Sequence, residues 1–186
     1  MKRITLFWVS LFILLLFVFP HQGEAQTYQT RNGHAEFTGY TPLFSFDGSS
    51  DSLSGSVILS DSAVSFQLPI KSIDTGNNKR NRDMIKTLKA ETYQYARFEG
   101  KIITPFRSDT SGVQKVKVKG TFKVHGTARE LTISGTMQFT ENSLNITAEW
   151  SQKLTAYDID PPSVLFYSMK DRQDIRVKAA LELSGK

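Results

Sequence analysis

Apolar and polar residues alternate along most of the chain, and this pattern is the first indication of its fold. In segment 113–125, Val116, Val118, Phe122 and Val124 alternate with lysine and threonine. A period of two places successive side chains on opposite faces of a strand, one face buried and the other in water. The same pattern predicts further strands, which cover residues 28–38, 43–46, 52–59, 64–68, 97–106, 131–139, 144–150 and 175–183.

Short turn segments separate these strands. Asn32-Gly33 and His125-Gly126-Thr127 predict hairpins, and residues 47–50 and 61–62 predict turns. About eight or nine strands at this spacing predict an all-β fold, either a sandwich or a barrel. A closed antiparallel barrel gives each strand one wet face and leaves no edge exposed, so it is the preferred interpretation.

One connection does not alternate. Between strands 64–68 and 97–106, Met84, Ile85 and Leu88 have the spacing of the inner stripe of a helix. We expect one short helix over residues 81–88, with Asn81 as its N-cap and Asp83 in its first turn. Long connections in compact β domains are usually functional, so this segment is predicted to rim or close a cavity.

The first 25 residues have the features of a signal peptide. Lys2 and Arg3 precede an apolar run over residues 4–19, and Gly23-Glu24-Ala25 offers small residues for a peptidase. We expect cleavage after Ala25, which leaves one barrel domain over residues 26–186 in the periplasm or outside the cell. An uncleaved membrane anchor is the alternative, although the apolar run is short for a spanning helix.

Composition and charge argue against several classes of function. The chain has no cysteine, which excludes disulfides, thiolate metal sites and cysteine nucleophiles. Its net charge is +5, but the lysines of segment 115–123 alternate with apolar residues. That pattern indicates the wet face of a strand and no nucleic-acid partner. Peripheral contact with a membrane and formation of a homodimer are both compatible with the sequence.

The sequence shows no constellation that would support catalysis. His34 and His125 are the only histidines beyond residue 25, and no acidic cluster at ligand spacing accompanies them. There is also no nucleophile elbow and no glycine-rich phosphate loop. We therefore expect a protein that is not an enzyme and has no metal site or cofactor.

The order of several motifs resembles that of a known family. The residues that carry the resemblance are Ser72–Gly76, Arg82–Met84, Tyr93–Gly100, Val118–Thr127 and Arg129–Ile133. In this order they resemble the YceI-like, polyisoprenoid-binding family of exported bacterial proteins. The segment Tyr95-Ala96-Arg97-Phe98 departs from the family pattern, which has a proline before the phenylalanine. The resemblance implies a lipocalin-like antiparallel barrel whose apolar channel holds a polyprenyl chain or a similar amphiphile.

Eight aromatic residues point toward the interior if the alternation is followed from strand to strand. They are Phe37, Phe44, Phe46, Phe66, Phe98, Phe122, Phe139 and Trp150. The residues by themselves favour filling of the core, because apolar stripes are normally core. The family resemblance instead implies that these side chains line a ligand channel.

Arg80 and Arg82 are the candidates for contact with an anionic head group. A guanidinium presents a planar fork of donors that suits phosphate, and a helix N-terminus adds backbone donors. Pairing of these arginines with carboxylates on the protein surface is the alternative.

Two hypotheses for function follow from these observations. In the first, an exported barrel binds, carries or sequesters an isoprenoid or fatty-acyl amphiphile in its interior. In the second, the barrel is filled and works as a non-catalytic interaction module in the cell envelope. A continuous internal cavity would favour the first hypothesis, and a packed interior the second.

Overall fold

The computed structural model describes residues 26–164 and 167–184. The predicted signal peptide lies outside the described residues. Eight long strands build the structure within this part of the chain. They are β1 (Thr27–Tyr40), β2 (Ser45–Ile58), β3 (Ala63–Pro69), β4 (Tyr95–Ile102), β5 (Gln114–Val124), β6 (Thr127–Phe139), β7 (Ser143–Lys153) and β10 (Arg172–Leu183). The shorter elements are η2 (Ile70–Ser72), α2 (Asn78–Thr87), η3 (Thr155–Tyr157), β8 (Ser163–Val164) and β9 (Tyr167–Ser168).

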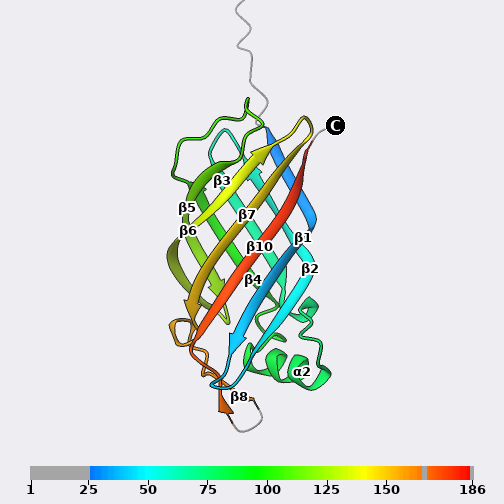
Figure 1. Ribbon diagram of the computed structural model, residues 1–186, viewed down its shortest axis with the longest axis vertical. Helices are drawn as coiled ribbons and strands as arrows, with labels where there is room; N and C mark the ends of the chain where they lie inside the picture. The colour runs from blue at the N-terminus through cyan, green and yellow to red at the C-terminus, as the bar shows by residue number, and fades with distance from the viewer. Residues whose placement is uncertain (1–25, 165–166, 185–186) are drawn as a thin grey trace, which may run out of the picture.

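The eight long strands form a closed barrel in the order β1-β10-β7-β6-β5-β4-β3-β2 (Figure 1). Every pair of neighbouring strands is antiparallel, and β1 pairs with both β2 and β10, which closes the sheet. The predicted all-β, lipocalin-like antiparallel barrel with one short helix is therefore confirmed. Closure removes the exposed strand edges that an open sheet of this size would present.

Strand β5 shows how the alternating sequence produces the wall. Val116, Phe122 and Val124 are buried, whereas the lysines between them are exposed. The strand then turns through His125 and Gly126, whose φ angles of 55° and 83° are both positive. Positive φ at both central residues is the requirement of a type I′ hairpin, so the predicted turn is present between β5 and β6.

Two other turn predictions are wrong. Asn32-Gly33 does not form a hairpin, because β1 continues through it with an irregularity in the register between Gln29 and His34. Residues 47–50 lie within β2, and the chain turns instead at residues 41–44. There the hydroxyl oxygen of Thr41 accepts a hydrogen bond from the backbone N–H of Phe44 at 3.1 Å. Backbone pairing along β1 and β2 thus prevails over the local turn preference.

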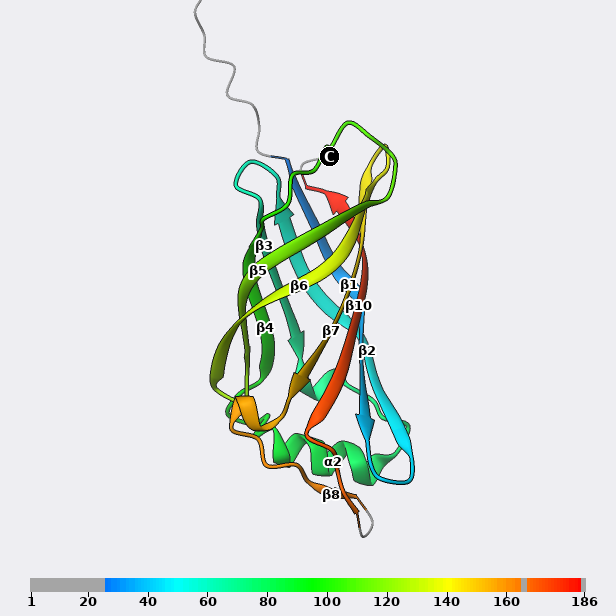
Figure 2. The same ribbon diagram turned by 60° about the vertical axis from the view of Figure 1, so that its left-hand side comes forward.

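Helix α2 begins earlier than the sequence predicts. Asn77, and not Asn81, is the N-cap, and its side chain accepts a hydrogen bond from the N–H of Arg80. Asp83 consequently lies beyond the first turn, where it pairs with Lys79 at 2.6 Å. The helix lies across the lower end of the barrel, beside the turn between β1 and β2 (Figure 2).

The opposite end of the barrel, where the described chain begins and ends, is packed solid. The ring of Phe139 stacks on Phe106 with 6.4 Å between centroids and meets the edge of Tyr28 at 5.9 Å. Leu144 and Leu181 are fully buried there. We call this the closed end of the barrel. We call the other end, which α2 crosses, the mouth.

Candidate ligand-binding site

A cavity of about 740 Å³ lies inside the barrel. Its walls come from the inward faces of the strands, and its lower boundary includes Met84 of α2 and Leu88, the C-cap of this helix. This volume is within the roughly 300–1,000 Å³ range of small-molecule sites in proteins. The interior is therefore hollow toward the mouth and filled at the closed end, which favours the binding hypothesis over the filled barrel.

Most of the aromatic residues singled out in the sequence line this cavity. The residues concerned are Phe37, Phe44, Phe46, Phe66, Phe98, Phe122 and Trp150. Phe139 does not line it, because this ring belongs to the packed cluster at the closed end. Alternation along a strand tells which face is inward, but it does not tell whether that level of the barrel is hollow.

Four of the lining phenylalanine rings lie over glycines. The pairs are Gly39 with Phe46, Gly48 with Phe37, Gly55 with Phe66, and Gly120 with Phe98. A Cβ atom added at these glycines would come within 2.8, 2.4, 2.3 and 2.7 Å of the ring, respectively. The absence of a side chain thus lets each ring lie close to the wall, and a larger residue would push the ring toward the cavity.

Loop residues that sequence analysis missed also line the cavity. Ile159, Pro162 and Met169 do so from the connection between β7 and β10. Because this segment has little regular structure, its apolar residues follow no periodic pattern that would have revealed them. Thr75 and Asn77 also lie at the boundary, in the turn that precedes α2.

Arg80 of α2 is a cationic residue at the cavity boundary, close to the mouth. Its Nη2 donates a hydrogen bond to the carbonyl oxygen of Thr75 at 2.9 Å, and its guanidinium lies 4.3 Å from the centroid of the Phe46 ring. Its Nε is buried and has no hydrogen-bond partner among the residues that the structure describes. No ion pair is formed by Arg80 within that part of the chain. A donor is therefore available beside the cavity.

A compact set of hydrogen bonds positions the first turn of α2, and with it Arg80. The side-chain oxygen of Asn81 accepts hydrogen bonds from the N–H and the hydroxyl of Thr75, and its amide donates to Asp74 at 2.8 Å. Donation from Asn81 and from the N–H of Gly76 lowers the pKa of the Asp74 carboxyl. The backbone of Asp74 in turn pairs with Ser49, which connects the start of the helix to β2.

The nearest carboxylates along the cavity boundary are already engaged. The ammonium of Lys79 donates to Asp83 and lowers the pKa of that carboxyl. Glu36 pairs with Arg176 at 3.0 Å on the outer face of the barrel. Lys79 is thus paired, and Arg80 and the exposed Arg97 are the boundary cations without an ion pair among the described residues; of these two, Arg80 has the buried donor without a partner.

Arg82 lies elsewhere. Its side chain is exposed, and it is not part of the cavity boundary. Residues two positions apart in an α-helix are separated by about 200° around its axis, so Arg80 and Arg82 face nearly opposite directions. Both arginines were candidates for the head-group contact from the sequence. Their positions around the axis of α2 place only Arg80 at the cavity.

The described residues show no cluster of side chains that could hold a metal ion. Across residues 26–164 and 167–184, no group of three or more His, Asp or Glu side chains is placed to hold a metal ion. The buried ring of His125 is held by its Nδ1, which lies 3.2 Å from the carbonyl oxygen of Tyr157, and by edge contact with Tyr93. In the same part of the chain, no helix is long and apolar enough to cross a bilayer.

Comparison with solved structures finds the same fold in several proteins of low sequence identity. A polyisoprenoid binding domain from Saccharophagus degradans, implicated in plant cell wall breakdown, has a TM-score of 0.72 at 13% identity, over 86% of this chain and 99% of that one. BcnA of Burkholderia cenocepacia has a TM-score of 0.63 at 13% identity, over 80% and 95%. The YceI protein of Campylobacter jejuni has a TM-score of 0.59 at 14% identity, over 75% and 85%.

Comparison with curated proteins finds no match to the sequence. The sequence profile of the YceI-like domain, in contrast, matches residues 26–183, which is nearly the whole of the chain beyond the predicted signal peptide. The resemblance seen in the motifs and the barrel seen in the structure agree with this match. The chain belongs to the YceI-like domain family.

Proposed function

We propose that this protein binds an isoprenoid or fatty-acyl amphiphile inside the barrel and carries or sequesters it outside the cytoplasm. The observation that carries the proposal is the apolar cavity of about 740 Å³ between the closed end and the mouth. The polyisoprenoid binding domain of similar fold supports the choice of an isoprenoid. No bond is made or broken in this function.

Burial of the hydrocarbon chain supplies the affinity. Each methylene removed from water contributes about 0.8 kcal/mol, so about ten methylenes contribute roughly 8 kcal/mol before ordering costs. Rings such as Phe98 and Phe122 are already packed against the wall, and Phe122 meets Trp150 edge to face at 5.8 Å. Preformed walls reduce the conformational entropy that binding would otherwise cost.

Arg80 binds the head group in this proposal. Its buried Nε lacks a partner, and a phosphate or carboxylate oxygen at the mouth would accept a hydrogen bond from it. An acyl or prenyl chain extending toward the closed end would place its polar group at this level. Arg82 has no part in this contact, because it faces away from the cavity.

The first experiment is native mass spectrometry of the protein purified from its own cell envelope without detergent, followed by extraction of bound lipid. We expect one class of long-chain amphiphile. Determination of the N-terminal residue of the same sample tests export, and we expect Gln26. A protein that is always empty, and that also fails to bind added polyprenyl phosphates, quinones and fatty acids, would refute the proposal.

Binding of a polyprenyl phosphate and of the uncharged polyprenol tests the role of Arg80. Hydrogen bonds to charged groups contribute about 1.5–3 kcal/mol, so Arg80→Gln should weaken phosphate binding roughly 10- to 100-fold. Binding of the polyprenol should change little. Arg82→Gln is the matched control on the same helix and should leave both affinities unchanged. Equal losses in the two variants would argue against a head-group contact at Arg80.

A further inference from the structure

The mouth carries exposed apolar side chains. Leu43 is 68% exposed and Phe44 36% exposed in the turn between β1 and β2, and Tyr167 is 39% exposed in β9. Figures 1 and 2 both place this turn, α2 and the β8–β9 pair at the same end of the barrel. Single exposed apolar residues are common on proteins. Here, however, Phe44 is also part of the cavity boundary, so the exposed apolar surface is continuous with the interior.

The same end carries a row of cations, which we call the α2 basic stripe: Arg82, Lys86 and Lys89. Arg82 and Lys86 are four residues apart and therefore lie on one side of α2, and Lys89 follows the C-cap of the helix, Leu88; all three are exposed. None of them forms an ion pair within the described residues. The carboxylates nearest to them in sequence, Asp83 and Glu91, are paired with Lys79 and Lys71.

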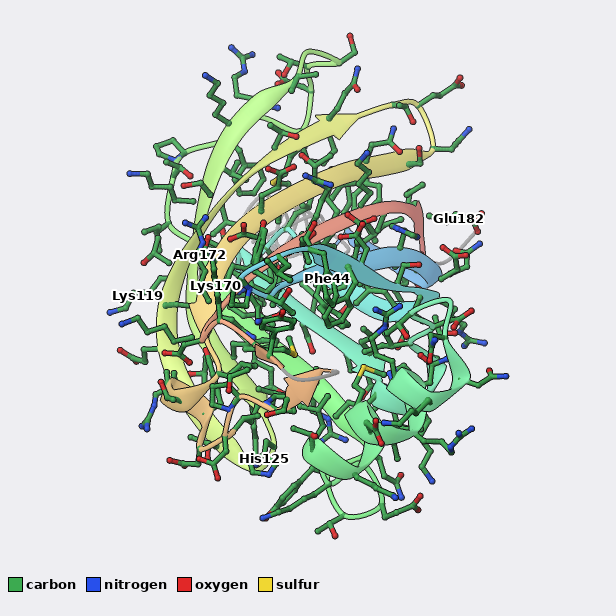
Figure 3. All side chains as sticks on the ribbon, turned by 60° about the horizontal axis from the view of Figure 1, so that its bottom comes forward. Phe44, Lys119, His125, Lys170, Arg172 and Glu182 are labelled. Carbon is green, nitrogen blue, oxygen red and sulfur yellow. The ribbon has the colours of Figure 1, made fainter. Side chains whose placement is uncertain are left out.

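Lys170 adds a further exposed cation at the mouth. Figure 3, in which this end comes forward, shows Phe44 and Lys170 near the opening, whereas Lys119 points away from the outer wall. Segment 77–89 contains five basic residues and one acidic residue, so its positive charge per residue is far higher than that of the chain as a whole, which carries +5 over 186 residues. Apolar tips beside unpaired cations are the combination found on proteins that lie at a lipid surface.

We propose that the mouth docks on the surface of a bilayer that contains anionic phospholipids. The α2 basic stripe contacts the lipid phosphates, and Leu43 and Phe44 enter the boundary between head groups and acyl chains. The inference rests on the proposed function, because a cargo taken up through a docked mouth need not pass through water. Each Lys or Arg near an anionic surface increases affinity by roughly fivefold.

Co-sedimentation of the protein with lipid vesicles tests the docking surface. Vesicles of phosphatidylglycerol mixed with phosphatidylcholine are compared with vesicles of phosphatidylcholine alone. We expect binding to the anionic vesicles that weakens with salt, because screening acts on exposed charges. The triple variant R82Q/K86Q/K89Q should bind these vesicles roughly 100-fold more weakly, as the loss of three such cations predicts.

A matched control has the same change in net charge far from the mouth. Lys101, Lys115 and Lys117 are exposed, are free of ion pairs within the described residues, and lie on β4 and β5 toward the closed end. The variant K101Q/K115Q/K117Q should retain the affinity of the wild type. For the apolar contact, Leu43→Ser should weaken binding, whereas Ile103→Ser, which changes a residue 55% exposed at the closed end, should not.

The outcomes separate docking from cargo binding. Equal losses in the two triple variants would show that only net charge matters and would overturn the proposal. Failure of the wild type to bind anionic vesicles would also overturn it. If lipid still co-purifies with the protein in either case, the proposed function stands and only the docking fails. Binding to vesicles by a protein that takes up no amphiphile would support docking and refute the carrier function.

Discussion

The substitution Ala148→Phe tests whether the barrel is hollow. Ala148 lies on β7 with its side chain at the cavity boundary, beside Gly135 of β6 and Val177 of β10. Because Ala148 lines the cavity of about 740 Å³, we expect a phenylalanine at this position to enter the cavity without displacing core side chains. Full burial of a Phe side chain contributes about 1.5–3 kcal/mol relative to its exposure. The variant should therefore be as stable as the wild type or more stable by about 1–2 kcal/mol.

A filled interior predicts the opposite sign. Insertion of extra carbon atoms into a packed core costs about 1–3 kcal/mol. Ala179 supplies the matched control, because it is buried and does not line the cavity. A Cβ added at Gly33 would lie only 3.0 Å from the Cβ of Ala179, which shows how little space exists there. Ala179→Phe should therefore be destabilised.

Equilibrium unfolding in urea measures both variants, and the midpoint at constant slope reports the change in free energy of unfolding. Binding of a polyprenyl phosphate to Ala148→Phe should also weaken, since the ring occupies the space of the chain. If Ala148→Phe and Ala179→Phe are destabilised equally, the interior is not hollow at Ala148, and the reasoning from the cavity fails.

Three further predictions address the core, the cavity and the outer wall. Leu144→Ala at the closed end should lower the free energy of unfolding by about 2–5 kcal/mol in urea titrations, because Leu144 is fully buried. Entry of a ligand should change the fluorescence of Trp150, which lines the cavity, and Trp150→Phe should abolish the response. Hydrogen bonds from Ser151 and Tyr40 lower the pKa of Asp174 from 3.8 to about 2. The stabilisation from this carboxylate is complete above about pH 4 and is lost as the pH falls through about 2. Unfolding at a series of pH values should therefore show a larger loss of stability in this interval for the wild type than for Asp174→Asn.

Much of the barrel could be predicted from local patterns. Alternation in segment 113–125 identified β5 and its buried face, and His125-Gly126 identified the hairpin that follows. Both features depend on neighbours in the sequence, since period-two alternation and positive φ are properties of a few adjacent residues. Turn chemistry alone was misleading at Asn32-Gly33, where pairing with two flanking strands holds β1 extended.

The functional site depended more on tertiary structure. Phe122 and Phe139 have the same inward phase in the sequence, yet one lines the cavity and the other packs on Phe106. Their difference is one of height along the barrel axis, which strand tilt and register determine.

The sequence by itself indicated which side chains face inward, favoured a closed antiparallel barrel over a sandwich and predicted one helix in a long connection. Only the tertiary structure decided where the interior is hollow. It also decided that Arg80 faces the cavity, whereas Arg82 belongs to the α2 basic stripe. The physical reason is that the face of a strand residue is set by its neighbours in the chain. The space in front of that residue is set by strands and loops distant in the sequence, and the cavity is the volume that they leave unfilled.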